Sequence, residues 1–231
     1  MCGRYGLALS GEEIADILQL ELGLGVSVEP RYNIAPCQLA PVVRLDQQGR
    51  RRLHLISWGL IPSWSRDPGV AHKLINARSE TAAEKPSFRE AMSRRRCLVP
   101  ADGFYEWRRS GGSKVAHHIG REDGALFCFA GLWERWTSPD GETRDTFSIL
   151  TTTPNDLVST LHDRMPVILA PSDHDRWLSR EVPAAGVADL LRPASEEAWT
   201  AWPVGSDVHH VDREGPDLRT RVDPVEQPRL L

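Results

Sequence analysis

Leu39-Ala40-Pro41-Val42-Val43-Arg44-Leu45 and Arg52-Leu53-His54-Leu55-Ile56-Ser57-Trp58 enclose a polar turn at residues 46–49. Apolar and β-branched side chains dominate both runs, and a short turn between two such runs predicts a β-hairpin. Outward along the chain, similar runs predict strands at 96–100, 103–107, 125–133 and 146–153. Turns between them are predicted at Gly111-Gly112 and at residues 138–141. The chain is therefore expected to be rich in strands.

Helices are predicted between and after these strands. Ser10 with Glu13 three residues later resembles a capping box, and an apolar stripe follows it at Ile14, Ile17, Leu18 and Leu22. Shorter helices are predicted at 87–92, 155–161, 173–178 and 196–202, and residues 162–169 are predicted to run from a loop into a strand. We predict one α+β domain over residues 1–213, with mostly antiparallel, curved, barrel-like sheets and flanking helices. Residues 214–231, with three prolines among charges, are predicted to form a loosely ordered tail.

Composition excludes several classes of protein. The 231 residues are 40% hydrophobic and 26% charged, with a net charge of −4, as in an ordinary globular protein. No apolar run reaches membrane-spanning length and no secretory signal opens the chain, so we expect a cytoplasmic protein, nucleoid-associated if the source is bacterial. The cysteines lie far apart without a CxxC pair, and His117-His118 and His209-His210 lack companion ligands at metal-site spacing. We therefore expect no metal and no cofactor, and we expect Cys97 and Cys128 to be buried packing residues.

Positive charge is concentrated in the first half of the chain. Residues 1–120 carry a net charge of +5, whereas residues 121–231 carry −9. Most of the basic residues are arginines, which include the triplets at 50–52 and 94–96. Arginine suits planar, bidentate contacts to phosphate, so a phosphate-binding face is compatible with the acidic overall charge. For the triplet at 50–52 we favour a solvated loop.

Cys2 would become the first residue if Met1 is removed. An N-terminal cysteine carries a thiol and a primary amine on adjacent carbons, and no internal residue offers this pair. The amine condenses with an aldehyde to an imine, the sulfur adds to the imine carbon, and a thiazolidine ring closes. Both groups are partly nucleophilic near neutral pH, because their ordinary pKa values are about 8 and 8.5.

Other polar residues stand in unusual surroundings. Glu106 lies between Tyr105 and Trp107 in an apolar strand; it is either an inward-facing acid/base with a raised pKa or a solvent-facing residue of an alternating strand. His162 and Arg164 precede a predicted strand, where they either relay protons and bind phosphate or are plain loop charges. Asn76 and Arg78, two residues apart, are expected to face one side. GxSxG, P-loop and GxGxxG motifs are absent from the sequence.

Seven blocks in register resemble the SRAP family, the SOS-response-associated peptidase or abasic-site-processing proteins, over about residues 2–212. They are Met1-Cys2-Gly3-Arg4, Tyr32-Asn33-Ile34-Ala35-Pro36, Trp58-Gly59-Leu60-Ile61-Pro62, Asn76-Ala77-Arg78-Ser79-Glu80-Thr81, Gly103-Phe104-Tyr105-Glu106-Trp107, Ala130-Gly131-Leu132-Trp133-Glu134 and His162-Asp163-Arg164-Met165-Pro166. The resemblance implies that Cys2 captures the ring-opened aldehyde of an abasic site in single-stranded DNA as a stable thiazolidine crosslink. It also implies weak lyase activity through the imine, and removal of Met1 by autoproteolysis or an aminopeptidase.

The same resemblance implies a role for each matching residue. Glu106 would be the acid/base, His162 would assist proton transfer, and Asn76 would orient Cys2 and the lesion. The DNA-binding residues would be the phosphate-binding Arg4, Arg78 and Arg164 and the base-contacting Pro36, Trp64 and Trp107. Two departures are the thiol of Cys37 after Pro36, where the family has a small or polar residue, and Val208-His209 in place of a Val-Asn pair.

Two other functions remain open at this point. One is an N-terminal-nucleophile amidohydrolase or peptidase that uses Cys2 with its own amine as base. The other is a non-covalent single-stranded DNA-binding module in which Cys2 is incidental. For any of the three functions, we expect a monomer.

Overall fold

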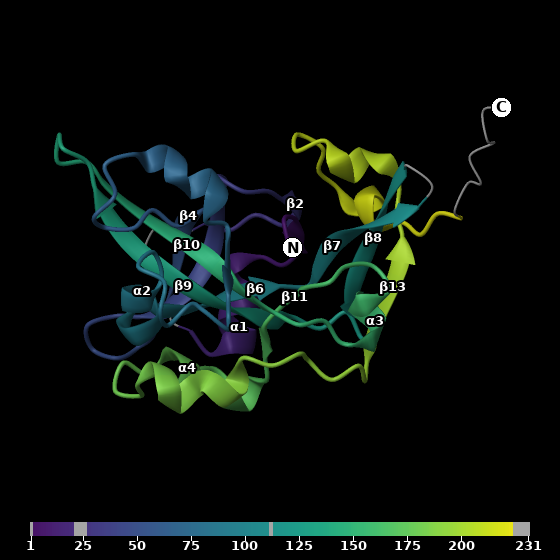
Figure 1. The fold of residues 1–231 in the computed structure, drawn as a ribbon. Helices are drawn as coiled ribbons and strands as arrows, with labels where there is room; N and C mark the ends of the chain where they lie inside the picture. Colours follow the sequence, from purple (N-terminus) through teal and green to yellow (C-terminus); the bar gives the residue numbers. More distant parts are fainter. Residues whose placement is uncertain (1, 21–26, 111–112, 224–231) are drawn as a thin grey trace.

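A closed barrel of five strands forms the centre of the fold (Figure 1). The computed structural model describes residues 2–20, 27–110 and 113–223. The barrel strands pair in the ring β10-β4-β3-β6-β9, which the pairing of β9 with β10 closes. Their bounds are β3 (Leu39–Leu45), β4 (Arg51–Trp58), β6 (Arg96–Ala101), β9 (Phe127–Thr137) and β10 (Thr143–Thr152). The α+β prediction of mostly antiparallel, curved sheets is confirmed.

The predicted hairpin is strands β3 and β4. They pair antiparallel from Leu39 opposite Ser57 to Leu45 opposite Arg51. The carboxylate of Asp46 organises the turn, because its Oδ1 accepts from the backbone N–H groups of Gln48 at 2.8 Å and Arg50 at 2.9 Å. An aspartate that accepts from following backbone amides is a common turn former.

Aromatic side chains fill the region where the barrel meets a second sheet. The ring of Trp58 lies 5.2 Å from that of Tyr5 and is stacked on Phe147 at 6.2 Å. Tyr5 also makes an edge contact with Phe129 of β9 at 5.8 Å. All four side chains are fully buried. Tyr5 therefore anchors the N-terminal strand, and with it Cys2, against the barrel.

The second sheet has the order β13-β8-β7-β1-β2. Its strands are β1 (Tyr5–Leu7), β2 (Arg31–Ile34), β7 (Gly103–Ser110), β8 (Ser113–Arg121) and β13 (Trp199–Pro203). Short strands extend the barrel sheet: β11 (Met165–Pro166) and β12 (Ile168–Leu169) lie at its ends, and β5 (Asn76–Arg78) pairs with β10. The turn predicted at Gly111-Gly112 lies outside the described residues.

The helix predicted at 196–202 is wrong. Strand β13 occupies most of this segment and pairs with β8, from Trp199 opposite Arg121 to Pro203 opposite His117. Trp199 also packs its ring 4.9 Å from Phe127 of the barrel. Ladder hydrogen bonds and this aromatic contact outweigh the weak local preference for a helix.

The helices are short and cover the outside of the sheets. Helix α1 (Gly11–Leu18) begins with the predicted capping box between Ser10 and Glu13. Ile14 and Leu18 are buried, but Ile17 is 54% exposed, so its assignment to the apolar stripe is wrong, and Leu22 lies outside the described residues. The remaining helices are α2 (Arg89–Arg94), α3 (Asp156–Ser159) and α4 (His174–Leu178), and the 3-10 helices are η1 (Pro68–Lys73), η2 (Pro171–Asp173), η3 (Ala184–Leu190), η4 (Ser206–His209) and η5 (Pro216–Arg219). Within the described ranges, no helix is long and apolar enough to cross a membrane.

Residues 214–223 belong to the segment expected to be a loose tail, and they contact the second sheet. The carboxylate of Glu214 accepts from Arg31 Nε and from the backbone N–H of Tyr32, both at 2.7 Å. The guanidinium of Arg219 forms a bidentate ion pair with Asp102, in which Nη1 lies 3.0 Å from Oδ2. Asp102 is 9% exposed, so this pair is largely removed from solvent.

We expect deletion of residues 214–231 to destabilise the protein by about 3–5 kcal/mol, because it leaves the Asp102 carboxylate buried without its cation. Urea denaturation measures the change in the free energy of unfolding. Deletion of 224–231 alone is the matched control, because it retains Glu214 and Arg219. Equal stability of the two truncated proteins would show that residues 214–223 contribute nothing.

Candidate active site

The pairing of β1 with β7 brings Cys2 to Glu106. Tyr5 lies opposite Phe104, and the Tyr105 N–H donates to the Arg4 carbonyl at 2.9 Å. In an antiparallel pair, each step back along one strand is a step forward along the other. Gly3 is therefore level with Glu106, and Cys2 lies directly beside it. The Cys2 side chain is fully buried.

Glu106 faces inward, which resolves the alternative left open by its sequence. Strand alternation places it on the same face as Phe104, whose ring packs 5.9 Å from Phe129 of the barrel. Its side chain is nearly inaccessible, and burial raises its pKa from the ordinary 4.5 to about 7. At neutral pH both the acid and the carboxylate are then populated, as general acid/base catalysis requires.

Burial also raises the pKa of the Cys2 thiol, and the nearby charge of Glu106 raises it further. The buried sulfur is therefore held as a thiol at neutral pH. A thiol adds to an electrophile only when its proton is removed. The carboxyl of Glu106 lies close enough to the sulfur for its charge to raise the pKa of the thiol.

Asn76 holds the main chain of Cys2. Strand β5 runs parallel to β10, with Asn76 opposite Ile149, and the Asn76 Nδ2 donates to the Cys2 carbonyl at 2.8 Å. Its Oδ1 is buried and has no hydrogen-bond partner among the described residues. Such an acceptor is costly to bury, and it is available to a donor at the N-terminus or on a ligand.

His162 lies between α3 and β11, and its side chain is 28% exposed. Its Nδ1 accepts from the Arg164 backbone N–H at 3.0 Å and lies 2.8 Å from Asp163 Oδ1. One nitrogen cannot accept and donate at the same time. With Nδ1 as acceptor, Nε2 carries the proton; when Nδ1 is protonated, the Asp163 carboxylate accepts it. The imidazole therefore has a favourable partner in either protonation state.

A depression of about 550 Å³ adjoins His162 and is lined by Arg78, Glu80, His162, Asp163 and Arg164. Arg164 is held there by the Glu80 carboxylate at 2.6 and 2.8 Å and by the Thr151 carbonyl at 2.5 Å. Arg78 is exposed. Asn76 and Arg78 thus connect the Cys2 region to this depression along one short strand.

The other residues expected to contact DNA have different surroundings. Arg4 is buried, and its Nη1 donates to Asn33 Oδ1 at 2.8 Å and to the Val208 carbonyl at 2.7 Å. Trp64 is 63% exposed, whereas Pro36 and Trp107 are half-buried. The ring of Trp107 lies 5.9 Å from His209, one of the residues that depart from the family pattern.

Asn33 and Glu80 are site residues that the sequence analysis did not single out. Asn33 is fully buried, accepts from Arg4, and donates to the carbonyls of His210 and Arg213, both at 2.9 Å. It thereby ties the chain after Cys2 to the C-terminal segment. Both residues lie in the blocks that carry the family resemblance. Their membership of these blocks is the sequence signal that could have identified them.

Cys37, the other residue that departs from the family pattern, is exposed and has a positive φ of 67°. Its Sγ lies 3.2 Å from His72 Nδ1. Burial raises its pKa, so it is not an activated thiolate. Cys97 and Cys128 are fully buried, as expected for packing residues.

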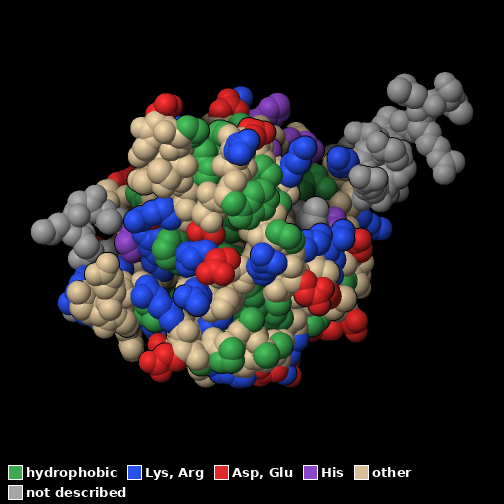
Figure 2. All heavy atoms as spheres, turned by 60° about the vertical axis from the view of Figure 1, so that its left-hand side comes forward, with side chains coloured by type: hydrophobic (Ala, Val, Ile, Leu, Met, Phe, Trp, Pro, Cys, Tyr) green, Lys and Arg blue, Asp and Glu red, His purple; other side chains and the backbone are tan. Residues whose placement is uncertain are grey.

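The arginine triplets are engaged mainly in contacts within the protein. The solvated loop favoured for 50–52 is wrong for Arg51 and Arg52, which lie on β4 and pair with Asp175 at 2.6 Å and Asp46 at 3.3 Å. Arg96 is buried and donates to backbone carbonyls, including that of Trp177 at 2.6 Å, while Arg95 pairs with Glu134 at 2.8 Å. Figure 2 shows Lys and Arg side chains across the middle of one face, with Asp and Glu side chains among them. No group of three or more His, Cys, Asp or Glu that could hold a metal ion occurs among the described residues.

We expect Glu106→Gln to flatten the pH dependence of stability. The folded carboxyl keeps its proton up to about pH 7, whereas the unfolded one loses it near its ordinary pKa of 4.5. In that window the folded state binds more protons, so the free energy of unfolding falls as pH rises. The uncharged amide of Gln removes this fall in the free energy of unfolding, which is on the order of 3 kcal/mol.

Urea denaturation at pH 5 and pH 8 measures this difference. The exposed Glu122 provides the matched control, Glu122→Gln, which should keep the pH dependence of the unsubstituted protein. Equal pH dependence of Glu106→Gln and the unsubstituted protein would contradict the raised pKa.

Comparison with known proteins identifies the family. The SOS response associated peptidase (SRAP) family matches residues 1–211. The abasic site processing protein YoqW of Bacillus subtilis is 38% identical, with 94% of this chain and 98% of the relative covered. HMCES of Gallus gallus, also called an abasic site processing protein, is 33% identical, with 84% and 67% covered. A crystal structure of a protein from Bacteroides thetaiotaomicron superposes with a TM-score of 0.88 at 28% identity, with 96% and 100% covered. The chain belongs to the SRAP family.

Proposed function

We propose that this protein processes abasic sites in single-stranded DNA by forming a covalent crosslink through Cys2. The observation that carries the proposal is the buried Cys2, whose carbonyl is held by Asn76 and whose thiol lies beside the raised-pKa carboxyl of Glu106. The relatives YoqW and HMCES, both named abasic site processing proteins, support DNA with abasic sites as the substrate.

The chemistry requires that Met1 be removed first, because the amine must belong to Cys2. The free amine adds to the aldehyde of the ring-opened sugar, and loss of one water gives an imine. The Cys2 sulfur then adds to the imine carbon, while the thiol proton passes to the imine nitrogen. The product is a thiazolidine, and the net by-product is one molecule of water. Elimination from the imine before ring closure would give a weak lyase activity.

Glu106 acts in both halves of this reaction, imine formation and ring closure. As an acid it donates a proton when the sugar opens and when water leaves, and as a carboxylate it accepts the proton of the buried thiol. A pKa near 7 supports both roles at neutral pH. His162 assists proton transfer at the sugar, and it can hold or release a proton because Asp163 and the Arg164 N–H stabilise alternative states. The buried Oδ1 of Asn76 accepts from the new N-terminal amine.

In this proposal, the DNA on either side of the lesion is contacted by Arg78, Trp64, Pro36 and Trp107. Arg78 and Trp64 are exposed, as phosphate and base contacts require. Arg164 presents a guanidinium already oriented by Glu80. Arg4 acts by holding the chain next to Cys2, since its guanidinium is buried against Asn33 and Val208. The protein acts as a monomer and uses no metal.

The crosslink is tested with protein whose loss of Met1 is verified by mass and an oligonucleotide that carries one abasic site. We expect a heat-stable shifted band on a denaturing gel. Cys2→Ala abolishes this band. Cys2→Ser retains the amine but forms no thiazolidine, so its adduct should require borohydride trapping.

Cys37→Ala is the matched control, because it removes an exposed thiol and should crosslink like the unsubstituted protein. An equal band with Cys2→Ala would contradict the proposal. Salt-sensitive binding without any covalent band would favour a non-covalent binding module. Turnover of a small amide in place of crosslinking would favour an N-terminal-nucleophile amidohydrolase.

We expect Arg78→Ala to weaken binding to single-stranded DNA and to reduce the slope of log K against log salt by about 0.7, the value for one phosphate contact. Fluorescence anisotropy over a salt series with Cys2→Ala as background measures the non-covalent step. Arg66→Ala, at another exposed arginine, is the control. An unchanged slope would remove Arg78 from the phosphate contacts.

A further inference from the structure

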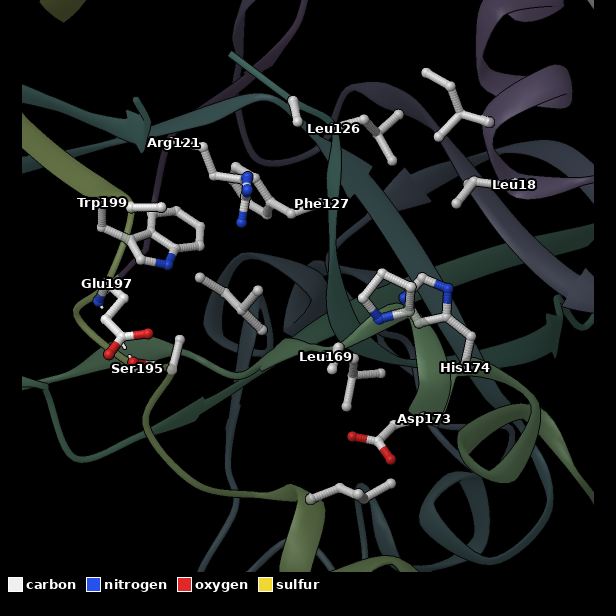
Figure 3. Close-up of a pocket in the computed structure, with 18 of the residues that line it drawn as sticks. Leu18, Arg121, Leu126, Phe127, Leu169, Asp173, His174, Ser195, Glu197 and Trp199 are labelled. Carbon is white, nitrogen blue, oxygen red and sulfur yellow. Dashed lines mark hydrogen bonds between the residues drawn. The ribbon is translucent and has the colours of Figure 1, made fainter. Parts of the chain in front are cut away.

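Strand β8 runs from the proposed site to the opposite end of the second sheet. At that end it borders a cavity of about 1170 Å³, where Figure 3 shows Arg121 and Phe127. None of the residues of the proposed site lines this cavity. At the other end β8 runs beside β7, and its His117 lies directly opposite Glu106. A second histidine is therefore a neighbour of the proposed acid/base.

His117 shares the face of the sheet on which Glu106 lies. The next residue, His118, packs its ring 5.3 Å from Tyr105 and 4.6 Å from Trp202, on the other face. Successive side chains of a strand point to opposite faces, and residues directly opposite each other share a face. The side chains of His117 and Glu106 are therefore adjacent, with Cβ atoms about 4.5–5.5 Å apart as in any such pair.

This pair lies where the core of the second sheet ends. Phe104 and Ile119, one row further in on the same face, are fully buried. Arg108, one row further out, is exposed. Glu106 is 2% exposed, whereas His117 is half-buried. Within this row the histidine is therefore the member that reaches solvent.

The two ring nitrogens of His117 have different roles. Nδ1 lies 3.1 Å from the Val115 carbonyl, which can only accept, so Nδ1 carries the proton. Nε2 is then an acceptor; it has no partner among the described residues and is not buried. Burial lowers the pKa of His117, and the charge of Arg108 lowers it further, so the ring is largely neutral at pH 7.

Other groups act on this pair from neighbouring elements. Besides burial, the charge of Asp163, before β11, raises the pKa of Glu106. The Cys2 thiol beside Glu106 stays protonated, and β13 contributes an uncharged proline opposite His117. Asp163 and Arg108 are both exposed, so salt screens their effects, and any test of the pair is made at fixed ionic strength.

We propose that His117 is the residue through which Glu106 exchanges its proton with solvent. The inference rests on the proposed function, in which Glu106 is the acid/base. When Glu106 gives its proton to the sugar, the new carboxylate favours a proton on the neighbouring imidazole. Nε2 then takes a proton from solvent and passes it to the carboxylate through one water, which general acid/base transfer permits. One N–H bond breaks as one O–H bond forms, and the neutral imidazole is restored.

Carbon-13 NMR of the imidazole Cε1 atoms over a pH series measures whether the two groups titrate together. We expect the His117 signal to show an inflection near pH 7, where Glu106 titrates, and Glu106→Gln to remove it. His54, half-buried on β4, is the control, and its curve should be the same in both proteins. Equal His117 curves in the two proteins would overturn the proposal without any crosslinking measurement.

The rate of crosslinking at pH 7 tests the proton transfer itself. His117→Phe keeps a ring without nitrogens, and we expect it to crosslink about tenfold more slowly, less than the loss of a direct acid/base causes. Added imidazole should restore most of this rate, because it supplies the missing base in solution. The rates of the unsubstituted protein and of His54→Phe should not respond to imidazole.

An unchanged rate in His117→Phe, or a slow rate that imidazole does not restore, would overturn the proposal, since a structural defect is not repaired by a base in solution. Absence of crosslinking in the unsubstituted protein, with the inflection of His117 present, would count against the proposed function alone.

Discussion

The antiparallel pairing of β1 with β7 is the constraint on which the site depends. It places Gly3 level with Glu106 and so brings Cys2 beside it, while Tyr5 and Phe104 anchor the two strands against Phe129 of the barrel. A thiol and a carboxyl brought into such an environment both lose solvation, which raises the pKa of each, and the charge of Glu106 raises the pKa of the Cys2 thiol further. The sheet register therefore keeps the Cys2 thiol protonated and the Glu106 carboxyl partly protonated at neutral pH, and the proposed chemistry uses these protons.

The surroundings of Cys2 conflict with the usual rule that buried polar groups have hydrogen-bond partners. Asn76 Oδ1 and Arg4 Nε are buried without partners among the described residues. These groups lie within one small region, next to a well-packed aromatic core. Local departures from complete hydrogen bonding are frequent where a site must accept a ligand or a new charge.

Strand β10 joins the two halves of the site. It pairs in parallel with β5, which supplies Asn76 and Arg78, and antiparallel with β11, which follows His162 and Arg164. The Thr151 carbonyl at its end accepts from both the Ser79 N–H and Arg164. Residues far apart in sequence thus meet at the end of one strand, and the Glu80–Arg164 ion pair closes the connection between them.

The sequence by itself determined the elements whose signals are local. These include the hairpin around residues 46–49, the Ser10–Glu13 capping box and the strand that contains Glu106, because turn and cap chemistry act within a few residues. Its motifs also included Asn76 and Glu106, which lie next to Cys2. Only the tertiary structure decided that Glu106 faces inward, that 199–203 is a strand, and that Arg4 is buried against Asn33 and Val208. The physical reason is that strand alternation leaves two equivalent faces until another sheet covers one, and an arginine's partner depends on chain segments that are distant in sequence.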